Sequence, residues 1–135
     1  GTTADEGTTA DEEPEDDMDA YFASLFDSQV ADERAKIYSD WRSAVNMSAS
    51  ELKKWDENPL SRKASVNPSA VIKRNLHLLE TPKDKWGAKE YQDAKRTIAF
   101  IARMKSVESG KPVSKDTELS KRDISLLNWA YDPRK

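Results

Sequence analysis

The sequence predicts an all-α protein: a small single-domain bundle of five or six short helices, preceded by a disordered acidic N-terminal arm. Apolar residues recur at spacings of three and four in several segments, and helix-capping residues precede most of them. No segment shows the alternation of apolar and polar residues that is typical of a strand. Because only 36% of the 135 residues are hydrophobic and 35% are charged, we expect a single core of modest size.

The arm comprises residues 1–17, in which GTTADE occurs twice and no large apolar residue is present. Such a segment cannot bury enough surface to offset its chain entropy, so we predict that it is disordered. Residues 1–33 hold twelve acids and no lysine or arginine, whereas residues 34–135 hold 13 acids and 22 bases, a balance of +9. The arm is therefore either a solubilising linker or a polyanion mimic that competes for the basic part of the chain.

A short amphipathic helix with its linker is predicted at residues 18–30. Acidic residues lie near its N-terminus, where the helix dipole favours them. Its large apolar residues share one face of the helix: Tyr21, Phe22, Leu25 and Phe26. Two interpretations of this face stay open, since it could bind a groove on a partner protein or form the first helix of the core.

The helical domain is predicted over residues 31–135. Ser48 and Glu51 have the spacing of a capping box, and Pro68 follows Asn67 as the first residue of a helix. Gly110 is expected to end the longest helix in the left-handed conformation. Together with apolar periodicity, these signals predict helices at about 32–45, 49–55, 68–80, 89–107 and 121–131.

The last sixteen residues carry the most consistent helix signals of the chain. Ser120 and Asp123 again have the spacing of a capping box, and the Asp132-Pro133 pair predicts the end of the helix. We expect the apolar residues of this segment to join the core: Ile124, Leu127, Trp129 and Tyr131.

Little in the sequence suggests catalysis, and we predict no enzymatic activity, no metal site and no cofactor. Without cysteine there is no disulfide, thiolate zinc site or cysteine nucleophile, and the chain does not depend on an oxidising compartment. The single histidine, His77, has no neighbouring ligand at a suitable spacing and is expected to pack or to face solvent. The four glycines form no phosphate-binding loop. The absence of cysteine also favours a cytoplasmic location. No apolar run approaches the roughly 20 residues that span a bilayer, so we expect no membrane contact.

Binding is the better-supported kind of function, and contact with a nucleic-acid backbone is its leading form. The bases of the second half occur mostly in adjacent pairs, near serines and a helix N-terminus that could bind phosphate. The alternative is that these basic residues have no binding role and only keep a small protein soluble. The predicted nucleic-acid-binding residues are Arg62, Lys63, Ser65, Lys73, Arg74, Lys95, Arg96, Lys121 and Arg122.

A structural or adaptor module is the alternative function, with the aromatic face of residues 18–30 and the acidic arm contacting a protein partner. Such a module could belong to a larger protein or to a virus particle. The four tryptophans have a similar pair of interpretations, because each could stack on a nucleic-acid base or fill the core. Core packing is the expected role of Trp55 and Trp129, since the rest of the chain offers few large apolar residues.

The closing run SLLNWAYDP, Ser125 to Pro133, resembles the Ser-Leu-x-Asn-Trp-x-x-Asp-Pro ending of domain-of-unknown-function family 3140. Ser50-Glu51-Leu52 and Trp55 add to the resemblance, which covers about Met47 to Lys135. The segment NPLSRKASVNPS departs from the family, which usually has a glycine-rich acidic stretch there. The resemblance implies a small intracellular helical protein associated with DNA, and related endings in phage-encoded proteins imply a virion location if this chain is phage-encoded.

Overall fold

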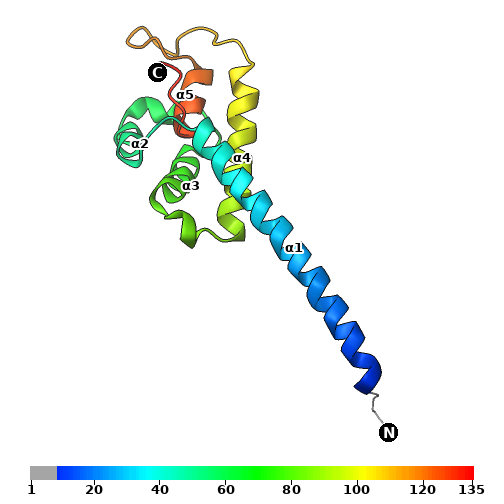
Figure 1. The fold of residues 1–135 in the computed structure, drawn as a ribbon. Helices are drawn as coiled ribbons and strands as arrows, with labels where there is room; N and C mark the ends of the chain where they lie inside the picture. Colours follow the sequence, from blue (N-terminus) through cyan, green and yellow to red (C-terminus); the bar gives the residue numbers. More distant parts are fainter. Residues whose placement is uncertain (1–8) are drawn as a thin grey trace. The chain divides into compact units, whose positions relative to one another are not determined.

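The structure, a computed structural model, describes the backbone of residues 9–135 and the side chains of residues 18–135. The all-α prediction is confirmed: residues 9–135 contain helices and short 3-10 turns but no strand, apart from one isolated bridge in the loop before the last helix (Figure 1). The elements are α1 (Thr9–Ala44), α2 (Ala49–Asp56), η1 (Pro59–Arg62), α3 (Pro68–Glu80), η2 (Lys83–Lys85), α4 (Ala88–Lys105) and α5 (Lys121–Asn128).

The chain divides into two compact units, Gly1–Lys36 and Ile37–Lys135. Helix α1 is a single helix of 36 residues, where the sequence predicted one helix within 18–30 and another at about 32–45. No proline or glycine lies between Met18 and Ala44, so nothing in the sequence interrupts the helix there. The disordered arm is not confirmed, because residues 1–8 lie outside the described residues and α1 begins at Thr9.

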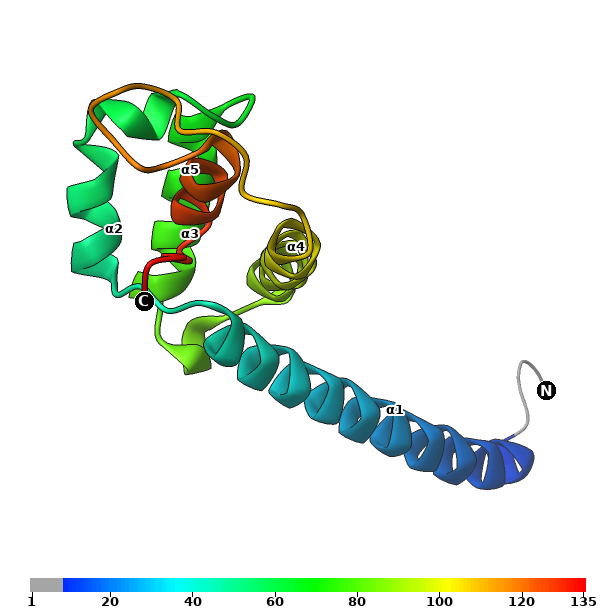
Figure 2. The ribbon, with the colours of Figure 1, turned by 90° about the horizontal axis from the view of Figure 1, so that it is seen from above.

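Helix α5 is central to the packing of the second unit. It packs against α2, α3, α4 and η1, and it lies among them in the view of Figure 2. Ile124 and Leu127 are fully buried in a cluster with Leu52 and Ile72. Trp129 and Tyr131 are only half-buried, so the prediction that they join the core holds in part.

A second cluster of the core is built from aromatic rings. The ring of Trp86 lies 4.9 Å from those of Tyr38 and Trp41 and 5.2 Å from that of Tyr91, in edge-to-face arrangements. Such arrangements add to the stabilisation from buried area. Trp41, Trp55 and Trp86 are buried, which confirms core packing for three of the four tryptophans.

Two capping boxes form as predicted, at Ser48 with Glu51 and at Ser120 with Asp123. The predicted helix ends are less accurate. Helix α4 ends at Lys105, before the predicted 107, and Gly110 adopts its left-handed conformation in the loop beyond it.

Helix α5 also ends earlier than predicted, at Asn128 and before the Asp132-Pro133 pair. It closes in a Schellman motif, in which the N–H of Ala130 donates to Leu127 O and the N–H of Tyr131 donates to Leu126 O. Ala130 takes the left-handed position of this motif, with φ 68°.

The carboxylate of Glu90 connects the start of α4 to α3. Its Oε1 accepts the backbone N–H of Gly87 at 2.8 Å, and its Oε2 lies 2.8 Å from Nε2 of His77. His77 is half exposed, as expected, but the sequence did not predict its pairing with a carboxylate. The Gly87 amide first, and His77 second, lower the pKa of Glu90 from 4.5 to about 2.

Because the pKa of Glu90 is lower in the folded state than its ordinary value, ionised Glu90 stabilises the fold above pH 4.5, and this contribution disappears as the pH falls towards 2. We therefore expect Glu90→Gln to have a lower Tm than the wild type at neutral pH and a Tm that approaches the wild-type value in acid. Circular dichroism melts across this range test the expectation. Glu108→Gln, in the exposed loop after α4, is the control, and a Glu90→Gln difference that is independent of pH would contradict the assignment.

Candidate binding groove

Three of the predicted nucleic-acid-binding arginines make contacts with other residues of the protein. Arg62 pairs with Asp56 at 2.9 Å. Nε of Arg122 donates to the carbonyl oxygen of Met104 at 3.0 Å, while its Nη1 lies 3.3 Å from Asp123. The guanidinium carbon of Arg74 lies 4.8 Å from the ring centroid of Trp129, where it makes a cation-π contact.

The other predicted residues are distributed over several elements. The side chains of Lys63, Lys73, Lys95 and Lys121 are exposed, in the loop after η1 and on α3, α4 and α5. Ser65 is half-buried, and its hydroxyl oxygen lies 3.2 Å from Nδ2 of Asn128. Only Ser65 and Arg96 of the nine line the groove described next, with Arg74 touching its aromatic floor.

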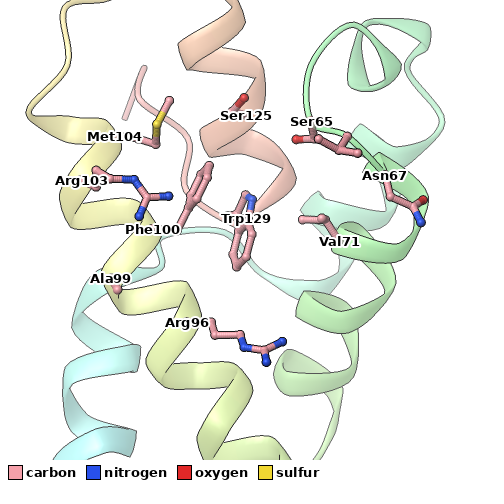
Figure 3. Close-up of a pocket in the computed structure, with 11 residues that line it drawn as sticks. Ser65, Asn67, Val71, Arg96, Ala99, Phe100, Arg103, Met104, Ser125 and Trp129 are labelled. Atoms are coloured by element: carbon pink, nitrogen blue, oxygen red, sulfur yellow. The ribbon is translucent and has the colours of Figure 1, made fainter.

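A groove of about 630 Å³ opens between α3, α4, α5 and the loop that joins η1 to α3 (Figure 3). We refer to it as the Trp129 groove, after the side chain near its centre in this view. Its lining is mostly apolar, with two arginines of α4 beside it. The lining residues are Ser65, Val66, Asn67, Val71, Arg96, Ala99, Phe100, Arg103, Met104, Ser125 and Trp129.

The floor of the Trp129 groove is a stacked aromatic pair. The rings of Phe100 and Trp129 are nearly parallel, at 14°, with centroids 4.4 Å apart. The guanidinium of Arg103 lies 5.4 Å from the Phe100 centroid, and that of Arg74 lies 4.8 Å from the Trp129 centroid. Because a ring face that is stacked on another ring has no room for a guanidinium as well, each arginine must cover the outer face of its ring. Each outer face of the stack is therefore partly covered by a guanidinium group.

The loop wall of the groove is held in place by Asn128, which is fully buried at the end of α5. Its Nδ2 donates to the carbonyl oxygen of Ser61 at 3.0 Å and lies 3.2 Å from the Ser65 hydroxyl. Ser65 has φ 77°, an uncommon conformation for a residue other than glycine. The next residue, Val66, is fully exposed. The loop wall thus exposes the apolar side chain of Val66 to solvent, while hydrogen bonds from Asn128 hold the loop in position.

The sequence reasoning did not select Val66, Phe100 or Arg103, which contribute much of the groove. A signal for Phe100 was present, because this aromatic residue lies outside the apolar stripe of α4, which residues such as Ala94 and Ile98 form, and beside the polar residues Asp93 and Thr97. A large apolar residue away from the core face of an amphipathic helix indicates a second contact surface.

The predicted partner-binding residues lie on α1 in the first unit. Tyr21, Phe22, Leu25 and Phe26 are 45% to 65% exposed, and Met18 beside them is 55% exposed. The rings of Tyr21 and Phe22 contact each other edge to face at 5.8 Å. These residues are therefore exposed, and their role in binding a partner stays a prediction.

Among the side chains that the structure describes, no group of three or more histidines and acids lies close enough to hold a metal ion. No helix within the described residues combines the length and apolarity needed to cross a membrane. Comparison with protein-family models, with curated proteins and with solved structures finds no match. The resemblance to family 3140 accordingly stays a prediction.

Proposed function

We propose that this chain is a non-enzymatic protein-interaction module, and that its Trp129 groove binds an acidic amphipathic helix of a protein partner. The observation that carries the proposal is the pairing of an apolar groove with the two arginines of α4 beside it, Arg96 and Arg103. Monomeric proteins rarely keep contiguous apolar surface in solvent without a binding role.

The apolar part of the groove provides the favourable free energy. Val66 is fully exposed and Val71, Phe100, Met104 and Trp129 are half-buried, so each has surface left to bury. Burial of apolar surface contributes about 25 cal/mol per Å². A helix that places apolar residues at spacings of three and four along one face is the kind of ligand that occupies such a groove.

The arginines provide the selectivity for acidic ligands. Arg96 and Arg103 are seven residues apart on α4, which places them on one side of the helix and about 10 Å apart along its axis. A bound helix with carboxylates two turns apart could meet both guanidinium groups, each in a bidentate ion pair. Lysine-rich or neutral helices would lack these contacts.

The covered aromatic stack favours a protein ligand over a nucleic-acid base. A base stacks on the open face of an aromatic ring, but here Arg103 and Arg74 lie over part of the outer faces of Phe100 and Trp129. The ring edges suit aromatic side chains, which pack edge to face, and aliphatic side chains, which make apolar contacts.

Fluorescence anisotropy of a labelled, designed acidic amphipathic helical peptide, titrated with the full-length protein, tests the proposal. We expect binding by the wild type, and at least about tenfold weaker binding by Arg96→Glu with Arg103→Glu, because both guanidinium groups would become repulsive carboxylates. Lys73→Glu with Lys95→Glu is the matched control, since it makes the same change of net charge on the exposed surface of α3 and α4. Equal weakening in both variants, or no binding by the wild type, would contradict the proposal.

The same titration with single-stranded DNA tests the nucleic-acid interface that the basic pairs predict. Binding to phosphates through Lys73 and Lys95 would weaken steeply with salt and would be lost in the control variant. That outcome would assign nucleic-acid binding to the exposed lysines of α3 and α4, outside the Trp129 groove.

A further inference from the structure

We infer that the helix that occupies the Trp129 groove is the aromatic segment of a second copy of this chain, residues 18–27 of α1. The inference rests on the proposed function, because it names the partner of the same groove. Each copy would then carry both halves of the interface.

The aromatic segment has the apolar face that the groove requires. Met18, Tyr21, Phe22, Leu25 and Phe26 lie on one side of α1, and all five are 45% to 65% exposed. Apolar residues at these spacings are the usual anchors of a helix that binds in a groove. The face is therefore formed on a helix before binding, which lowers the entropic cost of association.

The charge of the segment complements that of the groove. Asp19 borders the apolar face, Asp27 follows it, and residues 1–33 contain no lysine or arginine. The groove has Arg96 and Arg103 in its lining. Attraction between an acidic helix and these arginines would guide the encounter and orient the helix.

The same charges disfavour the simplest competing arrangement. If two copies paired through their aromatic segments directly, two segments whose only charged residues are acids would be brought together, and like charges across an interface are repulsive. Pairing of segment with groove avoids this repulsion and covers both apolar surfaces. Two copies could exchange segments reciprocally in a closed dimer.

A complementation experiment with full-length chains tests the inference. The segment variant carries Phe22→Ala with Phe26→Ala, and the groove variant carries Arg96→Glu with Arg103→Glu; all four side chains are exposed, so we expect both variants to fold. Size-exclusion chromatography with light scattering should find the mass of the wild type approaching two chains as concentration rises. Each variant alone should stay a monomer, because it lacks one half of the interface. An equimolar mixture of the two should regain association, since each supplies the half that the other lacks.

Failure of this inference is distinguishable from failure of the proposed function. If the wild type stays a monomer, or if the mixture of variants does not associate, the second copy is not the partner, whether the segment binds within its own chain or not at all. If the designed acidic peptide still binds the wild type in that case, the groove keeps its proposed role with a different partner. Absence of both self-association and peptide binding would overturn both proposals.

Discussion

Replacing Asn128 with leucine is expected to lower the free energy of unfolding by about 3 kcal/mol, although leucine has a similar volume and is more apolar. Asn128 is fully buried, and its Oδ1 accepts the indole N–H of Trp55 at 2.7 Å while its Nδ2 donates to Ser61 O at 3.0 Å. Leucine would leave a buried donor and a buried acceptor without partners, and each such group costs about 1–3 kcal/mol. Urea unfolding followed by circular dichroism measures the change.

Asn67→Ala is the matched control for stability, because Asn67 is exposed and its side chain makes no capping hydrogen bond at the start of α3. We expect it to change the free energy of unfolding by less than about 0.5 kcal/mol. If Asn128→Leu also lowered the free energy of unfolding by less than about 0.5 kcal/mol, water would have to replace Asn128 as the partner of Trp55 and Ser61. Because Asn128 also holds the Ser65 loop, Asn128→Leu should weaken peptide binding at the Trp129 groove as well.

Local signals in the sequence predicted the helices of the second unit well. A capping box such as Ser48 with Glu51 depends on residues three positions apart, so it is visible without knowledge of the fold. Helix ends depend on less visible features. The end of α5 is set by Ala130 in a left-handed conformation, a position where glycine would be the usual signal.

The continuity of α1 was missed because its apolar pattern changes phase between the aromatic segment and the residues around Trp41. If both apolar faces had to pack on the same core, such a change of phase would require a break in the helix between them. In the structure only the later part of α1 contributes a buried tryptophan, while the earlier face remains exposed. One helix can therefore carry two unrelated faces.

The Trp129 groove could be predicted only in part, because its residues come from three separate parts of the sequence. Basic pairs identified Arg74 and Arg96, but not that Arg74 would cover a tryptophan. The stacking of Phe100 on Trp129 joins α4 to the end of α5, and no sequence spacing encodes such a contact. Charge patterns indicated a binding surface, whereas its apolar floor required the packing of the helices.

Replacing Trp86 with alanine is expected to lower the free energy of unfolding by about 3–5 kcal/mol, the usual loss for a large buried aromatic residue. Trp86 lies against the rings of Tyr38, Trp41 and Tyr91, so its removal leaves a cavity that three rigid side chains cannot readily fill. The partly buried hydrogen bond from Nε1 of Trp86 to the carbonyl oxygen of Thr81, at 3.0 Å, is lost too.

Trp86→Phe separates the ring contacts from the hydrogen bond. It keeps an aromatic ring against Trp41 but loses the N–H, so we expect it to lose about 1–2 kcal/mol, distinctly less than alanine. Urea unfolding of both variants, with near-ultraviolet circular dichroism to report the remaining aromatic packing, provides the comparison. If alanine cost less than about 1 kcal/mol, the aromatic cluster would be loosely packed, and the second unit would depend on the α5 cluster alone.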